Sequence, residues 1–334
     1  MGAAAAGDTD EAVEVRPVGE SDAPALRGLI ERCYGDGYPK RVMYRPDELS
    51  QLISAGRFNG VVASAGEEIV GHIGFSWPDP EATVVEAGTT VVDPRWRGRG
   101  LMKGLAFGLA ELVAADGASG FIHFPTTAHG VMQRASLSAG GRETGIMACY
   151  LPAETRDLTD AGSREGRLSV TVVYQPVVEA KPQEIFVPGR YRELVQGLTE
   201  SLWLQRTIVE SPAEPTGESV LSQAFEESRG LERVTFERVG SDVAQRVRRV
   251  LEGTAAGLVH VDLPLSDPGV DFAVEQLLPE RFAFAAWMPG WAGHDVLRLQ
   301  WVRDPSEAEL APELFSPEAG KLMEMIRTEL SGGR

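Results

Sequence analysis

Residues 86–112 read EAGTTVVDPRWRGRGLMKGLAFGLAEL, and the rest of the chain can be read outward from this stretch. A β-rich run ends at Asp93-Pro94, a turn rich in glycine and arginine follows, and an apolar-periodic segment then begins. Leu105, Leu109 and Val113 recur at the spacing of one helix face. The pattern predicts a strand, a tight turn and a long helix, in that order.

The turn has the form R-x-x-G-x-G. A helix N-terminus carries unpaired N–H groups and the positive end of the helix dipole, and glycine lets an anion approach the backbone closely. The chain has a formal net charge of -17, yet this turn gathers four cations: Arg95, Arg97, Arg99 and Lys103. The turn therefore predicts a diphosphate site. The alternative is a solvated, arginine-rich turn before a surface helix.

Two other phosphate motifs are excluded. No Gly-Lys-Ser or Gly-Lys-Thr follows the turn, so it is not a P-loop. The third glycine of a dinucleotide-binding G-x-G-x-x-G is also missing.

The motif from Arg95 to Gly100, with its strand and helix, resembles the pyrophosphate loop of the GNAT N-acetyltransferase superfamily. Members of this family move acyl groups from acyl-coenzyme A onto amines. The resemblance implies acetyl-CoA or another acyl-CoA as co-substrate, with its diphosphate at the turn and its pantetheine arm along the strand. The residues implied for cofactor binding are Val91, Val92, Arg97, Gly98, Arg99, Gly100, Leu101 and Met102.

Hydrophobic periodicity along the first half predicts the order β-α-α-β-β-β-α-β-α-β-β, which matches the GNAT topology along residues 12–176. We expect an α/β (α+β) fold in which helices flank a mixed, mostly antiparallel sheet. The predicted strands are 12–18, 58–63, 68–77, 83–92, 120–124, 144–150 and 168–174. The predicted helices cover 21–34, begin near 46 and near 101, and cover 128–139.

The second half weakly repeats part of the first. GFIH at 120–123 returns as GLVH at 257–260, and ACYLP at 148–152 returns as AAWMP at 285–289, at the same separation. No R-x-x-G-x-G occurs in the second copy, so the repeat predicts a degenerate GNAT-like domain and one cofactor site per chain. We expect a tail at 1–11, an acyltransferase domain at 12–178 and the degenerate domain at 179–334. Connecting loops are expected at 160–166 and 210–219, strands at 234–239 and 296–302, and helices at 242–251 and within 310–330.

Composition bounds the class of protein. The chain has 334 residues, 43% of them hydrophobic and 24% charged, which is typical of globular protein. No apolar run approaches the roughly 18 residues of a membrane span, and the N-terminus lacks the pattern of a signal peptide. Cys33 and Cys149 are too far apart for a metal motif, so we expect no metal, two buried cysteines and a cytoplasmic location. The acidic balance argues against nucleic acid or a membrane as partner and leaves a homodimer open.

Amide formation from a thioester needs a neutral amine, donors for the developing oxyanion, and a proton for the leaving thiolate. Glu86 opens the strand that leads into the turn, a place similar to that of the glutamate base of histone-type GNAT enzymes. A solvated glutamate at the strand edge is the alternative. Asp93 is expected to cap the turn. For the oxyanion, the resemblance points to a backbone N–H near Val91 or Val92, where the strand typically bulges.

The proton donor departs from the family pattern. Ser136 stands where the family usually has a tyrosine, and His129 stands where it has an asparagine. Ser136 can hydrogen-bond near the coenzyme A sulfur, and His129 can relay a proton or simply lie at the surface. His123, on a predicted buried strand, is interpreted as a core histidine. The resemblance also places the loop between the first two helices over the acceptor, where Tyr34, Tyr38 and Tyr44 either line the site or cover surface.

The sequence thus predicts an acyl-CoA-dependent N-acyltransferase, most simply an N-acetyltransferase, that moves an acyl group to a primary amine by direct attack. The acceptor is expected to be a small-molecule or peptide amine. Two alternatives stay open. One is an acyl-CoA-binding sensor or scaffold without turnover. The other is a GNAT-like acyl-CoA decarboxylase or hydrolase.

Overall fold

The computed structural model describes residues 12–38, 40–153, 166–210 and 214–332, and all structural statements refer to these residues. The expected tail at 1–11 and most of the expected loop at 160–166 lie outside them. The described chain forms two compact units. The first contains residues 12–76 and 87–112, and the second contains 77–86, 113–153 and the described residues from 166 onward. The expected division near residue 178 remains a prediction.

The first unit is built on a four-stranded sheet in the order β1-β2-β3-β4. Its strands are β1 (Val13–Pro17), β2 (Asn59–Ala65), β3 (Glu68–Ser76) and the end of β4 (Val84–Val92). β2 pairs antiparallel with β1 and with β3, in the register Val13↔Ala65 and Asn59↔Phe75. The first residues of β4, 84–86, belong to the second unit, and residues 87–92 belong to the first.

Helices cover both faces of this first sheet. Successive strand residues point to opposite faces. Val62 lies in the core with α1 (Ala23–Tyr34) and α2 (Pro46–Ser54), whose buried residues include Leu26, Leu29, Ile30 and Leu49. Val61 faces the other way, toward α3 (Leu101–Ala115), where a Cβ on Gly108 would come within 3.6 Å of its side chain. The short helices η1 (Glu20–Asp22), η2 (Arg41–Tyr44) and η3 (Pro94–Trp96) complete the unit.

The second unit contains an eight-stranded run in the order β5-β7-β6-β13-β14-β12-β11-β10. The order β5–α4–β6–β7 along the chain returns as β12–α7–β13–β14, and the sheet orders β5-β7-β6 and β12-β14-β13 correspond. This recurrence supports the repeat seen in the sequence, while a GNAT origin of the second copy stays a prediction. The strands are β5 (Gly120–His123), β6 (Arg142–Leu151), β7 (Leu168–Pro176), β10 (Val220–Glu226), β11 (Leu231–Arg238), β12 (Leu258–Pro264), β13 (Ala283–Met288) and β14 (Val296–Val302).

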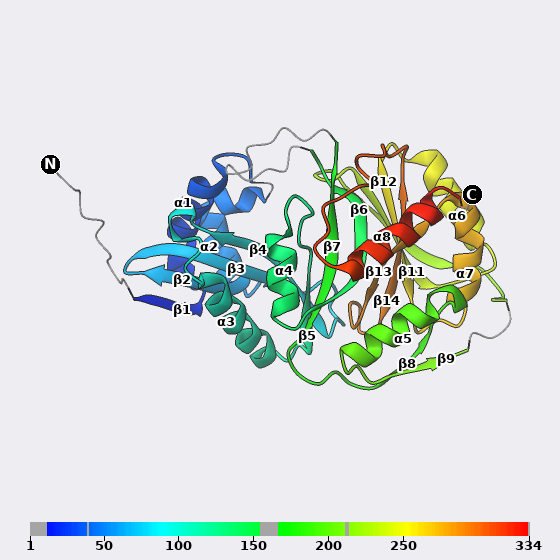
Figure 1. Cartoon of the computed structure of the whole chain (residues 1–334), viewed down its shortest axis with the longest axis horizontal. Helices are drawn as coiled ribbons and strands as arrows, with labels where there is room; N and C mark the ends of the chain where they lie inside the picture. The colour runs from blue at the N-terminus through cyan, green and yellow to red at the C-terminus, as the bar shows by residue number, and fades with distance from the viewer. Residues whose placement is uncertain (1–11, 39, 154–165, 211–213, 333–334) are drawn as a thin grey trace. The chain divides into compact units, whose positions relative to one another are not determined.

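The helices of this unit are α4 (Gly130–Ser138), α5 (Arg192–Ser201), α6 (Val243–Gly253), α7 (Val270–Leu277) and α8 (Pro317–Leu330). α8 packs on β6 and β13, across the middle of the sheet (Figure 1). Two short strands, β8 (Gln183–Phe186) and β9 (Arg206–Val209), pair in parallel outside it. The short helices η4 (Gly189–Tyr191) and η5 (Leu278–Glu280) precede α5 and follow α7.

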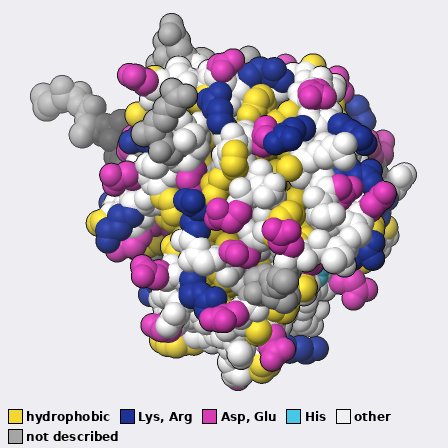
Figure 2. All heavy atoms as spheres, turned by 90° about the vertical axis from the view of Figure 1, so that its right-hand side faces the viewer, with side chains coloured by type: hydrophobic (Ala, Val, Ile, Leu, Met, Phe, Trp, Pro, Cys, Tyr) yellow, Lys and Arg dark blue, Asp and Glu magenta, His cyan; other side chains and the backbone are white. Residues whose placement is uncertain are grey.

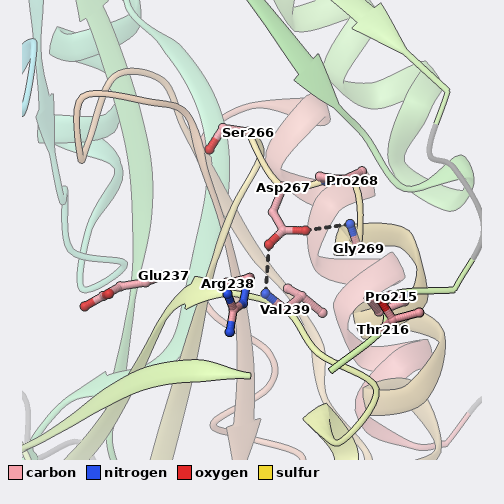
Figure 3. A pocket seen from close by; sticks show the side chains of 9 residues that line it. All are labelled: Pro215, Thr216, Glu237, Arg238, Val239, Ser266, Asp267, Pro268 and Gly269. Atoms are coloured by element: carbon pink, nitrogen blue, oxygen red, sulfur yellow. Dashed lines mark hydrogen bonds between the residues drawn. The ribbon is translucent and has the colours of Figure 1, made fainter. Parts of the chain in front are cut away.

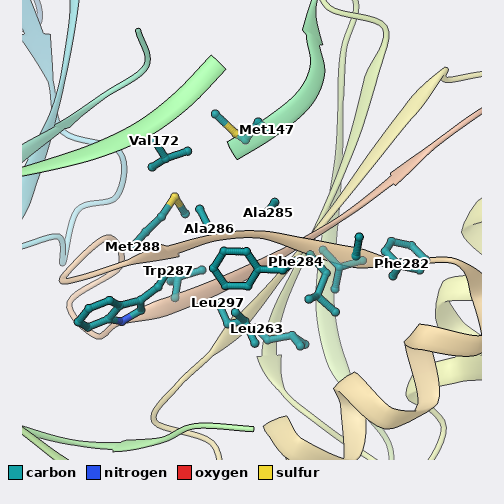
Figure 4. Packing of buried hydrophobic residues seen from close by; sticks show 14 of the residues in the cluster. Met147, Val172, Leu263, Phe282, Phe284, Ala285, Ala286, Trp287, Met288 and Leu297 are labelled. Carbon is teal, nitrogen blue, oxygen red and sulfur yellow. The ribbon is translucent and has the colours of Figure 1, made fainter. Parts of the chain in front are cut away.

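The two copies meet where β6 lies beside β13. The strands pair at Gly145 and Ala286, and the buried amide of Gln300 bridges them beyond that point. Gln300 accepts from the Ala148 N–H at 2.7 Å and donates to the Phe284 carbonyl at 2.8 Å. Figure 4 shows the side chains of β13 packed among those of neighbouring strands. One amide thus replaces the ladder hydrogen bonds that two diverging strands cannot make to each other.

Most elements expected from periodicity are present, and β14 has the expected bounds. The helix expected within 310–330 begins only at Pro317, because Ser316 caps it there by accepting from the Ala319 N–H. The pattern missed β8, β9, β10 and α5. β10 is an exposed strand at the end of the sheet, so it has no buried face to impose alternation. Both cysteines are buried, as expected.

None of the described helices combines the length and the hydrophobicity needed to cross a membrane. On the face of the molecule drawn in Figure 2, acidic and basic side chains are interspersed.

We expect Gly145→Ala to destabilise the protein by about 1–3 kcal/mol, the usual cost of forcing an extra methyl group into a packed core. A Cβ at Gly145 would fall deep inside the van der Waals contact distance of the Ala285 carbonyl oxygen. The control is Gly197→Ala on exposed helix α5, where a Cβ meets no described atom within 4 Å and alanine favours the helix. Urea unfolding of both variants tests this, and equal midpoints would contradict it.

Candidate functional site

The predicted phosphate-binding turn forms a tight loop that leads into α3. Gly98 and Gly100 have φ values of 77° and 78°, a region that side chains with a Cβ rarely occupy. A Cβ at either glycine would meet no described heavy atom within 4 Å, and both glycines are exposed. The backbone of the turn therefore faces open space immediately before the N-terminus of a helix of 15 residues.

The carboxylate of Asp93 holds this turn in place. Its carboxylate is 1% exposed and accepts from the Arg95 backbone N–H at 2.9 Å and from Arg32 of α1 at 2.6 Å. The Arg95 guanidinium also donates to it, and this hydrogen bond is the largest of the effects that hold the pKa of Asp93 far below its usual range. The expected capping role of Asp93 is confirmed.

The cations of the turn divide into two groups. Arg95 is committed to Asp93 and Glu68 and is a structural part of the turn. Arg97 and Arg99 are exposed. Arg97 donates from Nε to the Val92 carbonyl at 3.1 Å, and the Arg99 guanidinium lies 4.7 Å from the Trp96 ring centroid. These two exposed side chains are thus held next to the glycines of the turn.

The regular dihedral angles of strand β4 (Val84–Val92) are interrupted at one residue within the strand, Thr89. Thr89 has a φ of 53°, which is unusual for a β-branched residue. The bulge and oxyanion N–H expected near Val91 or Val92 stay a prediction, and Thr89 lies two residues earlier in the same strand. His72, a site residue missed by the sequence analysis, approaches the Thr89 carbonyl with Nδ1 at 2.9 Å. A single histidine on a buried strand gave no pattern by which to find it.

The loop between α1 and α2 is ordered by its tyrosines over the described residues. The Tyr44 hydroxyl donates to the Gly35 carbonyl at 2.6 Å and accepts from the Tyr38 N–H at 2.9 Å. The rings of Tyr34 and Tyr38 lie 4.8 Å apart, and all three tyrosines are half-buried against the core of α1 and α2. They are structural parts of this loop, and their contact with an acceptor stays a prediction.

Glu86 lies at the start of β4, in the second unit, and is half-buried. Its neighbours there include Tyr150 and Arg229, with which it interacts electrostatically. The Arg229 guanidinium lies 4.9 Å from the Tyr150 ring centroid, and the Tyr150 ring stacks on that of His260 at 5.7 Å. The carboxylate predicted to be the base thus lies among an aromatic ring and a cation.

The structure brings His123 and Ser136 together, which the sequence analysis did not foresee. His123 Nε2 lies 2.7 Å from Ser136 Oγ, and Ser136 Oγ donates to the Met132 carbonyl at 2.8 Å. Because the serine hydrogen is used there, His123 carries its proton on Nε2 and donates it. Burial lowers the pKa of His123 to about 4. His129 lies exposed at the N-cap of α4 and makes no side-chain capping bond.

The second copy holds a cavity of about 390 Å³ at the ends of β11 and β12 (Figure 3). Its walls include Glu237, Arg238 and Asp267. The Asp267 carboxylate accepts from the backbone N–H groups of Val239 at 2.8 Å and Gly269 at 2.7 Å. The chain's own carboxylate therefore occupies the N–H groups that a phosphate would need. Among the described residues, no His, Cys, Asp and Glu gather as metal ligands.

Residues 23–134 match the model of the acetyltransferase (GNAT) family. Among solved structures, the ribosomal-protein-S18-alanine N-acetyltransferase from Escherichia coli is similar at 15% identity and a TM-score of 0.39, over 51% of this chain and 97% of that chain. The PaiA N-acetyltransferase from Thermoplasma acidophilum, in complex with coenzyme A, is similar at 13% identity and a TM-score of 0.36, over 49% and 99%. The comparison with curated proteins gave no match.

The region that matches the family model contains α1, strand β4, the glycine turn and the first half of α4. Residues 23–134 of this chain therefore belong to the acetyltransferase (GNAT) family.

Proposed function

We propose that the protein is an N-acyltransferase that moves the acyl group of an acyl-CoA, most simply acetyl-CoA, to a primary amine by direct attack. The observation that carries this proposal is the turn at Arg97–Gly100. It combines two glycines of positive φ, open space beside the backbone and two exposed arginines immediately before a long helix. These features suit a diphosphate, which needs close backbone approach and positive charge.

We assign each residue of the turn a role toward the co-substrate. Gly98 and Gly100 would admit the diphosphate to the backbone, and Arg97 and Arg99 would balance its charge. Leu101 and Met102 begin the helix whose first N–H groups have no intrahelical partners. Val91 and Val92 end the strand along which the pantetheine arm would lie. The second copy has no R-x-x-G-x-G turn, and Asp267 occupies the Val239 N–H after β11, so we propose one cofactor site per chain.

Glu86 is our candidate for the general base. An alkylammonium must lose a proton before it attacks the thioester, and a carboxylate can accept that proton directly or through water. The residue is half-buried and precedes the interruption of β4 at Thr89. Its neighbours Tyr150 and Arg229 supply a hydroxyl and a cation with which an acceptor can also interact.

Ser136 and His129 remain candidates for delivering a proton to the thiolate. The Ser136 hydroxyl donates to the Met132 carbonyl and accepts from His123, so it would have to release that carbonyl before it could donate to the thiolate. His129 is exposed, so water reaches it. The acceptor is proposed to be a small-molecule or peptide amine, and the cytoplasmic location stays a prediction. The departure from tyrosine at residue 136 keeps the sensor without turnover as the second candidate.

We predict that Gly98→Glu abolishes acyl-CoA binding, because the new side chain brings bulk and negative charge to the diphosphate position. The control is Gly117→Glu, since Gly117 is also exposed, has a φ of 85° and has open space beside it. Isothermal titration with acetyl-CoA measures both variants. Wild-type affinity in Gly98→Glu would refute the proposed cofactor site.

We predict that Glu86→Gln lowers kcat by about 10²–10⁴, the usual contribution of a general base, while acetyl-CoA affinity stays unchanged. A free-thiol assay with a panel of primary amines measures turnover, and Glu81→Gln, an exposed site nearby in sequence, is the control. A loss of less than threefold would remove Glu86 from this role. No thiol release above hydrolysis by the wild-type protein, despite acetyl-CoA binding, would favour the sensor.

A further inference from the structure

We propose that His72 is a positioning residue that holds strand β4 in its interrupted form at Thr89, beside the acyl group of the bound thioester. This inference rests on the proposed function, because it assigns a role in acyl-CoA binding. It adds a residue from a neighbouring strand, β3, that lies outside the glycine turn and carries none of the roles assigned above.

The starting observation is the backbone of Thr89. A left-handed conformation is strained for a residue with a Cβ, and such strain persists only where surrounding contacts impose it. Thr89 is 9% exposed and lies within a strand, where nothing about chain reversal requires a positive φ. Glu86 precedes it in β4, and Val91 and Val92 follow it. The strained residue therefore divides the proposed base from the proposed cofactor contacts.

The interruption opens β4 to free space. A Cβ at Gly88, the residue before Thr89, would meet no described heavy atom within 4 Å. By contrast, a Cβ on Gly74 of β3 would come 3.5 Å from the Gly88 carbonyl oxygen, so that side of the strand is packed. An acyl group thus has room beside the interruption only on the open side of the strand.

His72 supplies the contact that holds Thr89. Its Nδ1 faces the Thr89 carbonyl oxygen at 2.9 Å, and an oxygen with lone pairs requires a donor, so Nδ1 carries the hydrogen. His72 is 1% exposed, and its Nε2 is buried with no hydrogen-bond partner among the described residues. Burial lowers the pKa of His72 to about 4. The ring is therefore neutral at physiological pH, and its single N–H donates to the Thr89 carbonyl.

The surroundings keep this ring in place. It stacks on Phe58 at 5.5 Å with an interplanar angle of 13°, between the sheet and the core of α1 and α2. Gly60 of β2 leaves the room that Nε2 occupies, since a Cβ there would lie 3.1 Å from it. Such packing allows one ring orientation, which is what a positioning residue needs.

The side chain of Thr89 is held as well. Lys40 Nζ lies 3.3 Å from Thr89 Oγ1, and the Tyr38 hydroxyl interacts with the same side chain. Both residues belong to the loop between α1 and α2. Thr89 is thus held through its carbonyl by His72 of β3 and through its hydroxyl by that loop. Of these contacts, the hydrogen bond from His72 acts on the backbone of Thr89, and loss of the histidine removes it.

The test compares His72→Leu with His72→Asn. Leucine and asparagine have nearly the same size, but asparagine keeps an N–H donor near the position of Nδ1. Affinities of wild type and variants for acetyl-CoA and for free CoA are measured by calorimetry, with turnover from free-thiol release. We expect His72→Leu to weaken acetyl-CoA binding about tenfold, as loss of one buried hydrogen bond can do, and to change CoA binding less than twofold. His72→Asn should stay within about threefold of wild type for both.

A second variant separates positioning from general loss of structure. Thr89→Gly takes up a positive φ without strain, so His72 should become dispensable in that background. We expect His72→Leu to cost less than twofold when Thr89 is glycine, with Thr90→Gly as the control in which the tenfold cost persists. The pH profile of turnover between pH 5 and 8 should keep its shape in His72→Asn, because the neutral histidine does not titrate there.

Three results would overturn the inference. These are wild-type acetyl-CoA affinity in His72→Leu, equal losses for acetyl-CoA and CoA, or equal losses in the leucine and asparagine variants. If His72→Leu does not fold, the asparagine variant and the Thr89→Gly background still decide the matter. A donor that holds Thr89 in its strained conformation must matter less when residue 89 is glycine. A wild-type protein that binds neither nucleotide would instead refute the proposed function itself, and that result is distinct from any change among the variants.

Discussion

The buried carboxylate of Asp93 is the constraint on which the candidate cofactor site depends. It receives Arg32 from α1 and both the backbone N–H and the guanidinium of Arg95, so one anion fixes the end of β4, the start of the turn and the first helix. These partners lower its pKa below the ordinary value of about 3.9. Their contribution to stability is therefore complete above that value and is lost as the pH falls below it.

From this anchor, strand β4 and the turn after it order the proposed chemistry along one piece of chain. Glu86 opens the strand, Thr89 interrupts it, and Gly98 and Gly100 follow Asp93. Strain and open space occur at the same places. Thr89 is held in a left-handed conformation by a buried histidine, and the two glycines adopt theirs without a steric penalty. Thr89 is one of five described non-glycine residues with a positive φ, and it is the one that lies in β4 between Glu86 and the glycine turn.

The repeat shows how a similar order of elements can persist without such a site. In the second copy, Asp267 satisfies the N–H groups of Val239 and Gly269, and no R-x-x-G-x-G turn precedes α6. What this copy retains is its core: Trp287, Phe284 and Leu297 are fully or almost fully buried around β13. The buried amide of Gln300 then joins the copies through β6 and β13. Burial of apolar area and hydrogen bonding of the buried polar groups are sufficient reasons for the second copy to persist.

Local sequence determined the strand before the turn, the turn itself, the helix after it and most other elements, because period and glycine placement act over a few residues. It also indicated a repeat and the capping role of Asp93. Only the tertiary structure decided the partners of those residues. Arg95 forms ion pairs with Asp93 and Glu68, so it is no longer one of the cations proposed for the cofactor. His123 contacts Ser136, and His72 contacts Thr89. Those contacts join residues from different elements, and a hydrogen bond between distant segments depends on how the strands and helices pack, which no local pattern encodes.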